Sequence, residues 1–148
     1  MKLPANNLTG EIPAEIGSFN VIETISLYAN KITGTIPVEM GQLLTLEELR
    51  LFRNKLEGSI PAELGSLTDL RILYLNNNFL TDVIPSELGE LQSLERFHIN
   101  NNQLSGCIPE ELGQLTALIR VNAHTNKLSG DFPEGLDALC GKLSLIHI

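Results

Sequence analysis

The stretch LRLFRNKL, residues 49–56, places the aromatic Phe52 between Arg50 and Arg53 in a chain whose formal net charge is -8. Arginine presents a planar fork of N–H donors that fits a carboxylate, and arginine and aromatic side chains are enriched at binding hot spots. Related side chains recur elsewhere in the chain, at Tyr28, Tyr74, Asn76, Arg96, His98, Arg120 and His124. These residue types favour recognition of a partner that carries acidic groups.

Residues suited to catalysis or metal binding are few and poorly placed. His98 and His124 fall at non-equivalent positions without a carboxylate cluster, so we expect no metal site. Cys107 and His124 lack the third group that would orient a nucleophile and its base. The motifs G-x-S-x-G, H-E-x-x-H, G-x-G-x-x-G and the Walker loop are absent from the sequence. We therefore predict a non-enzymatic chain without catalytic residues and without a cofactor.

The regular spacing of these residues comes from an internal repeat of 24 residues. Proline recurs at this step at Pro13, Pro37, Pro61, Pro85, Pro109 and Pro133. Asparagine does the same at Asn6, Asn30, Asn54, Asn78, Asn102 and Asn126. Two glycine columns, one opening with Gly10 and one with Gly17, and several columns of Leu and Ile complete the unit. A repeat of this length predicts stacked units that share one core.

Each repeat contains apolar residues in alternation, followed by an Ile-Pro-x-Glu-Leu-Gly segment. The alternation is typical of a half-buried strand, and stacked units would pair these strands in parallel. The Ile-Pro segment predicts a short helical turn, because proline suits the first position of a helix and the helix dipole stabilises a glutamate in the first turn. One unit alone is too small to bury its apolar face, so its stability depends on its neighbours.

The full unit reads L-x-x-L-x-L-x-x-N-x-L-[ST]-G-x-I-P-x-E-L-G-x-L. It resembles the leucine-rich repeat, and its [ST]-G-x-I-P part resembles the plant-specific subclass of receptor-like kinases and polygalacturonase-inhibiting proteins. The resemblance implies an α/β repeat solenoid, a right-handed superhelix with a parallel β-sheet on the concave face and short 3-10 or helical turns on the convex side. It covers residues 1–148 as one solenoid of about five full repeats with partial repeats at both ends.

The asparagine column is expected to point inward where each strand ends. A buried amide must be hydrogen-bonded, and a ladder of stacked amides would bond to its own turn and to the adjacent repeat. Both glycine columns are expected to adopt positive φ. Two aspartates replace glycine in these columns, at Asp82 and Asp137, and Asp is among the residues that tolerate this conformation.

The variable strand positions are expected to form the concave surface. Over this face and its flank the sequence places seven cations and one anion, Glu48, so the acidic excess of the chain lies elsewhere. The cations are Lys31, Arg50, Arg53, Lys55, Arg96, Arg120 and Lys127. Phe52 is predicted to be exposed on this surface, with Tyr28 and Asn76 beside it across the repeats. The alternative is a solvated sheet face that binds nothing within this segment.

The two ends of the sequence lack visible capping segments, so we expect an interior piece of a longer protein. The spacing slips by one residue near Cys140, after which LSLIHI either resumes the apolar pattern or is an unrelated tail. Cys107 and Cys140 occupy non-equivalent places, so no disulfide between them is expected. Asn7 begins an N-glycosylation sequon, Asn-Leu-Thr, which matters only in a secreted protein.

By resemblance, the chain is expected to be a protein- or peptide-binding module from the ectodomain of a receptor-like protein or receptor kinase, located at the cell surface. Its partners would be a peptide or protein with an acidic segment and a co-receptor ectodomain. The alternative is a secreted inhibitor similar to polygalacturonase-inhibiting proteins. The acidic net charge argues against a nucleic-acid partner, and no apolar run is long enough to span a membrane.

Overall fold

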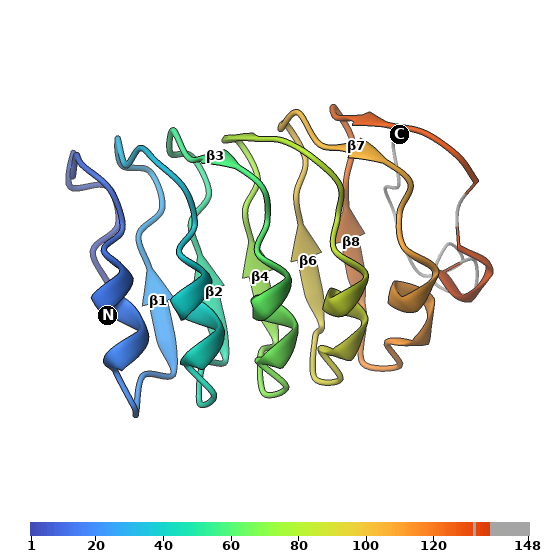
Figure 1. Ribbon diagram of the computed structural model, residues 1–148, viewed down its shortest axis with the longest axis horizontal. Coiled ribbons are helices and arrows are strands. Elements are labelled where there is room, and N and C mark those ends of the chain that lie inside the picture. The colour runs from blue at the N-terminus through green and yellow to red at the C-terminus, as the bar shows by residue number, and fades with distance from the viewer. Residues whose placement is uncertain (132, 137–148) are drawn as a thin grey trace.

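Short parallel strands, one from each successive turn of the chain, line one side of the molecule (Figure 1). A computed structural model describes residues 1–131 and 133–136. The five strands of this sheet are β1 (Thr24–Ser26), β2 (Glu48–Arg50), β4 (Ile72–Tyr74), β6 (Arg96–His98) and β8 (Arg120–Asn122). Each strand residue pairs with the residue 24 positions later, so the sequence repeat sets the register.

Five 3-10 helices lie on the opposite side of the solenoid, as the Ile-Pro segments predicted (Figure 1). They are η1 (Ala14–Ser18), η2 (Val38–Gln42), η3 (Ala62–Ser66), η4 (Ser86–Glu90) and η5 (Glu110–Gln114). A proline with φ between -60° and -74° precedes each helix, and a glutamate lies in each first turn. The expected arrangement of a parallel sheet opposite short helical turns is confirmed.

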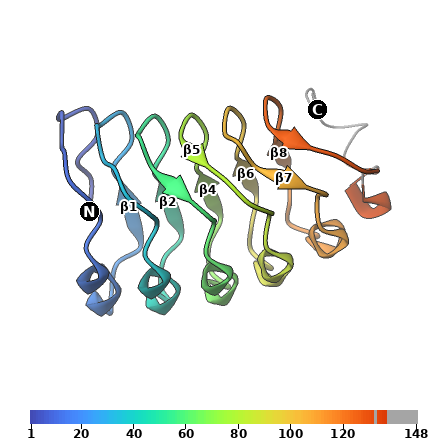
Figure 2. The ribbon, with the colours of Figure 1, turned by 45° about the horizontal axis from the view of Figure 1, so that its top comes forward.

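A second set of short parallel strands follows the asparagine turns. β3 (Glu57–Gly58) pairs with β5 (Phe79–Leu80), and β7 (Ser105–Gly106) pairs with β9 (Lys127–Leu128) (Figure 2). Strands of two residues contain no alternation that a sequence pattern could reveal, so this pairing was not predicted. These ladders hold the returning chain of each repeat against the next repeat.

The core consists of the Leu and Ile columns stacked between the sheet and the helices. Leu49, Leu73 and Phe97 occupy one column in β2, β4 and β6, and each is 0% exposed. Phenylalanine can replace leucine at position 97 because the neighbours of this column are apolar. Burying such side chains stabilises a fold by about 1.5–3 kcal/mol each, so adjacent repeats support one another.

The two glycine columns serve different purposes. Gly34, Gly58 and their equivalents have φ of 74° to 89°, and Asp82 takes the same conformation at 66°, as expected. The second column does not adopt positive φ, so that prediction was wrong. At Gly17 a Cβ atom would lie 2.5 Å from the carbonyl oxygen of Glu39, so glycine is needed for close backbone packing between neighbouring helices. Asp137 lies outside the described residues.

Candidate functional site

The exposed side of the five-stranded sheet gathers most of the side chains that the sequence singled out. Register places Arg50, Tyr74, His98 and Asn122 in one row across the sheet. A second row contains Glu48, Ile72, Arg96 and Arg120. Residues separated by two along a strand point to the same face, so both rows lie on one surface.

Four rings form a continuous stack across successive repeats. The rings of Tyr28 and Phe52 are parallel, with centroids 4.5 Å apart and planes 7° apart. Phe52 meets Tyr74 edge-on at 6.1 Å and 72°. Tyr74 then stacks on His98 at 4.3 Å and 12°. The sequence predicted Tyr28 and Asn76 beside Phe52, and of these the stack contains Tyr28; the inclusion of His98 was not predicted.

The stack changes what these rings offer to a partner. Phe52 lies outside the core, yet it is half-buried rather than fully exposed as predicted, because Tyr28 covers one of its faces. Tyr28 and Phe52 each cover one face of the other ring, as do Tyr74 and His98, so a partner meets ring edges, the uncovered faces and the tyrosine hydroxyl groups. A tyrosine hydroxyl both donates and accepts hydrogen bonds. The stack is therefore a fixed, amphipathic ridge.

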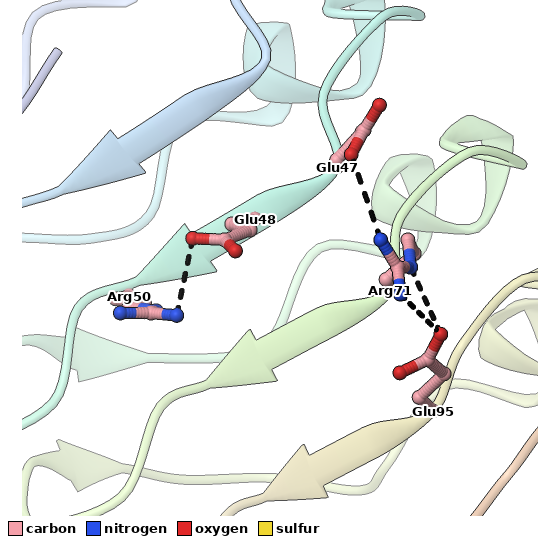
Figure 3. Close-up of polar contacts among 5 residues, drawn as sticks. All are labelled: Glu47, Glu48, Arg50, Arg71 and Glu95. Carbon is pink, nitrogen blue, oxygen red and sulfur yellow. Dashed lines mark hydrogen bonds and ion pairs between the residues drawn. The ribbon is translucent and has the colours of Figure 1, made fainter.

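Arg50 is held in place by its own strand. Its Nη2 lies 3.1 Å from Oε2 of Glu48, two residues earlier on β2 (Figure 3). Its guanidinium carbon lies 6.0 Å from the ring centroid of Tyr74, within range of a cation–π contact. Glu48, the anion that the sequence placed among the concave cations, thus neutralises Arg50. Arg50 supports the ridge, and its charge is largely compensated.

Arg96 and Arg120 lie side by side without a counter-ion among the described residues. They are register partners on β6 and β8, and both are exposed. Neither makes an ion pair with any residue that the structure describes. Arg53 is likewise exposed and makes no such pair. Two adjacent like charges repel each other, so this part of the sheet favours an anionic partner.

His98 links the ridge to this pair of cations. Burial, followed by the charges of Arg120 and then Arg96, lowers the pKa of His98 to about 4. The imidazole is therefore neutral at neutral pH, and its stacking on Tyr74 requires no desolvation of a charge. Its Nε2 is buried without a hydrogen-bond partner among the described residues, as is Oδ1 of Asn122 in the next strand.

The concave surface is narrower than the sequence indicated. Ser26 and Ile72 occupy predicted surface positions but are only 5% and 8% exposed. Asn100, also placed on this surface, is 7% exposed. Neighbouring side chains on a sheet cover one another, and a small or apolar residue sinks below its larger neighbours. Asn76 is half-buried, and Nδ1 of His124 lies 2.8 Å from Oγ1 of Thr125.

A residue in the left-handed conformation follows each strand of the main sheet, three positions after the strand ends. Ala29, Arg53, Asn77, Asn101 and Thr125 all have φ between 56° and 58°. The sequence analysis did not identify this conformation, although the two asparagines are a signal for it. The turn directs Arg53 outward, and it places a β-branched side chain at Thr125 in a strained region.

The asparagine column lies inward, directly behind this turn. Nδ2 of Asn78 donates to the carbonyl oxygens of Leu51 and Leu75 at 3.1 and 3.0 Å, and its Oδ1 accepts from the Leu56 amide at 3.1 Å. Asn30, Asn54, Asn102 and Asn126 repeat this pattern. The amides therefore fix the end of every strand to the repeat before it.

Asn6 departs from the column. It is exposed, and its Nδ2 donates to the carbonyl oxygen of Pro4 within the same turn. The partners that its equivalents use lie 22 and 27 residues earlier, which is beyond the first residue of this chain. Asn7, which begins the glycosylation sequon, is exposed beside it. Glycosylation of Asn7 stays a prediction.

The sequence did not predict the positions of two further groups of charge, the ion pairs of Arg71 and the cation Lys2. Arg71 lies 2.7 Å from Glu95 and 4.0 Å from Glu47, which joins three repeats at the start of their strands (Figure 3). These residues occupy equivalent positions 24 apart, so opposite charges in one column were the available signal. The backbone of Lys2 forms an isolated parallel β-bridge with Ser26, which places Lys2 in the row of Arg50, two repeats before it.

Neither a metal cluster nor a membrane span is found in the described part of the chain. Among residues 1–131 and 133–136, no group of three His, Cys, Asp or Glu side chains is placed to hold a metal ion. No helix within those ranges is long and apolar enough to cross a membrane. Cys107 is exposed and forms no disulfide with a described residue, and Cys140 and the LSLIHI tail lie outside the described residues.

Comparison with protein families matches two segments of the chain. A model described as "Leucine Rich repeats (2 copies)" matches residues 45–89, and one described as "Leucine Rich Repeat" matches residues 93–115. A comparison with curated protein sequences found no significant match. The family models thus cover the central repeats, which form β2 to η5 in the structure.

Solved structures of plant receptors are similar over most of the chain. The ectodomain of the Arabidopsis thaliana receptor kinase GASSHO1/SCHENGEN3, in complex with CASPARIAN STRIP INTEGRITY FACTOR 2, is 37% identical with a TM-score of 0.87, covering 90% of this chain and 16% of that one. The Arabidopsis HAESA ectodomain, in complex with an extended IDA peptide hormone, is 36% identical with a TM-score of 0.89, covering 94% and 24%.

A shorter ectodomain is matched over most of its own length. That of the Arabidopsis thaliana receptor kinase SOBIR1 is 32% identical with a TM-score of 0.82, and the match covers 86% of this chain and 70% of that one. The chain spans less than a quarter of the larger ectodomains. Its 24-residue register, asparagine column and receptor matches agree: the chain belongs to the leucine-rich repeat family, with repeats of the kind found in plant receptor kinase ectodomains.

Proposed function

We propose that this chain is a non-catalytic binding module from a receptor ectodomain, and that its concave surface takes a peptide or protein segment bearing carboxylates. The observation that carries the proposal is the uncompensated pair Arg96 and Arg120 at one end of a fixed aromatic ridge. The similar ectodomains of GASSHO1/SCHENGEN3 and HAESA are in complex with CASPARIAN STRIP INTEGRITY FACTOR 2 and with a peptide hormone, respectively, which supports a binding role here.

The ridge and the cations would contact different groups of a bound segment. Tyr28, Phe52 and Tyr74 present ring edges, onto which apolar or proline side chains of an extended segment can pack. Arg53, Arg96 and Arg120 flank the ridge with donors for carboxylates. Because the rings already contact one another, the surface is rigid before binding, and little side-chain entropy is lost on association.

The location and the second partner follow from the same proposal. A receptor ectodomain is extracellular, and in that setting Asn7 would be glycosylated. A further partner is a co-receptor ectodomain: one similar structure is the BIR3–SERK2 complex from Arabidopsis thaliana, 34% identical over 88% of this chain. A secreted enzyme inhibitor would use the same concave surface, but the similar structures reported above are receptor ectodomains.

The proposal is tested with a fluorescent acidic probe, the decapeptide (Glu-Pro)5, which stays extended because of its prolines. Binding is measured by fluorescence anisotropy at low and at physiological salt. Arg120→Ala is expected to weaken binding at least fivefold, since it removes an exposed charge that no carboxylate of the described chain compensates. The separate variant Tyr74→Ala is also expected to weaken binding, because it interrupts the ridge.

Arg71→Ala is the matched control. It removes the same charge from a position where Glu95 and Glu47 already neutralise the guanidinium. It should change the affinity by less than twofold. Equal losses for Arg120→Ala and Arg71→Ala would mean that only net charge matters, and the proposed site would be rejected.

A further inference from the structure

A groove runs along the convex side of the solenoid, away from the concave surface. Its central part has a volume of about 630 Å³ and lies where the chain returns from β3 and β5 to the helices η3 and η4. Figure 2 shows these returning segments side by side. An adjoining part of about 580 Å³ shares Thr35, Ile36 and Val38 with the central part, so the groove continues across successive repeats.

The floor and one wall of the central groove are apolar. Ile60 and Ile84 form the floor beside Pro61 and Pro85. Val38 and Val83 line it while remaining 51% and 56% exposed. Covering an apolar lining of this kind with another chain is favourable, because apolar surface is removed from water.

The rim of the groove is acidic throughout. Glu63, Asp82 and Glu87 line the central part, and Glu11 and Glu39 line the adjoining part. Neither part is lined by a lysine, arginine or histidine. None of these five carboxylates forms an ion pair with a described residue. The groove therefore concentrates uncompensated negative charge over an apolar floor.

We infer that this convex groove is a second binding surface, which takes an extended peptide segment carrying alternate lysine or arginine residues. Alternate residues of a polyproline II chain lie about 6 Å apart along its axis, and three residues complete each turn, so cations at alternate positions surround the chain. Those on the side that faces the groove would meet the carboxylates of successive repeats, such as Glu63 and Glu87. The other residues on that side would cover the valines and isoleucines of the floor.

Opposite charge preferences distinguish the two surfaces. The concave surface would favour an acidic segment and the convex groove a basic one, so the molecule could hold two partners, or two parts of one partner, at once. The inference does not rest on the concave proposal, because no residue is shared between the two surfaces. Each can fail without the other.

The test uses fluorescent (Lys-Pro)5 as the probe, with (Glu-Pro)5 as its counterpart of opposite charge. The double variant E63Q/E87Q is expected to weaken (Lys-Pro)5 binding at least tenfold and to leave (Glu-Pro)5 binding within twofold. The control E23Q/E90Q removes the same charge from exposed carboxylates outside the groove and should have less than a twofold effect. Circular dichroism verifies that all variants fold alike.

A second pair of variants separates apolar contact from charge. Val38→Ser in the groove should weaken (Lys-Pro)5 binding at least threefold, while Leu44→Ser, at a 61% exposed position elsewhere, should not change it. The inference is overturned if E63Q/E87Q and E23Q/E90Q weaken (Lys-Pro)5 binding equally, or if (Lys-Pro)5 does not bind the wild type. It is overturned as well if Val38→Ser leaves the affinity for (Lys-Pro)5 unchanged. It is also overturned if sedimentation shows a wild-type dimer that E63Q/E87Q disperses, since the groove would then hold a second copy of the chain.

Discussion

The ring of Tyr28 lies flat against the ring of Phe52, with centroids 4.5 Å apart and planes 7° apart. The two residues are 24 positions apart in sequence, and each follows a strand of the main sheet. Stacking of this kind explains how a phenylalanine is tolerated between two arginines on the concave surface. Part of its surface is removed from water without entering the core.

This contact predicts that Phe52→Ala lowers the free energy of unfolding. An aromatic pair contributes about 0.5–1.5 kcal/mol beyond the area that it buries, and Phe52 meets both Tyr28 and Tyr74, so we expect a loss of about 1–3 kcal/mol. Urea unfolding monitored by circular dichroism measures it. Phe79→Ala is the control, since Phe79 is 52% exposed and stacks on no described ring. Equal effects at the two positions would show that the stack adds nothing.

The amide of Asn78 gives a prediction about the inner turn. Asn78→Ala removes two donated bonds and one accepted bond, and it leaves the carbonyl oxygens of Leu51 and Leu75 and the amide of Leu56 buried with fewer partners. Each orphaned buried group costs about 1–3 kcal/mol, so we expect a loss of at least that size in urea unfolding.

Asn76 provides the matched comparison for Asn78. It lies two residues earlier, is half-buried, and makes no side-chain hydrogen bond with another described residue. Asn76→Ala should change stability by no more than about 0.5 kcal/mol. A neutral result for Asn78→Ala would contradict the view that the inward amides hold the turns together.

The repeat made much of this fold predictable, since one 24-residue period fixes the strand register, the helical turns and the core columns together. The second glycine column carried no such signal. Gly17 and its equivalents were assigned positive φ, although their role is to admit the backbone of the next repeat, as Glu39 shows. Both roles select glycine, so residue type alone could not separate them.

The concave surface was predictable by position but not by contact. Alternation along the strands placed Arg50, Phe52 and Tyr74 on one face, yet it could not reveal that Arg50 is paired with Glu48 or that His98 completes the aromatic stack. Those contacts depend on side-chain rotamers and on the twist between repeats. The convex groove depends on how the returning segments pack, which the repeat pattern does not specify.

Thr125 carries a prediction of increased stability. It has φ of 57°, a conformation that is strained for a β-branched residue, while asparagine occupies the equivalent positions 77 and 101. Thr125→Asn should therefore raise the free energy of unfolding by up to about 1 kcal/mol. Asn77→Thr is the reverse experiment and should lower it by a similar amount. If both variants are destabilising, the strain at this turn is not what decides the preference.

His98 makes stability depend on pH. Its pKa falls to about 4 in the folded protein, from the usual value of 6.5, so the unfolded chain binds the proton more tightly. The resulting stabilisation is fully present above pH 6.5 and is lost as the pH falls from 6.5 through 4. We expect urea unfolding to show a decline over this window that is smaller in the variant His98→Gln, which cannot take up the proton.

The cause of the shift is tested by proton titration of the His98 imidazole, followed by NMR. The double variant R96Q/R120Q should raise the pKa of His98, because the charges of these arginines are two of the three causes that lower it. The value should stay below 6.5, since burial is the largest cause and remains. Arg53→Gln removes a cation that is not among the causes and should leave the titration unchanged. Binding of an acidic segment across Arg96 and Arg120 would offset the same two charges, so (Glu-Pro)5 should also raise the pKa of His98, linking the titration directly to occupancy of the concave surface.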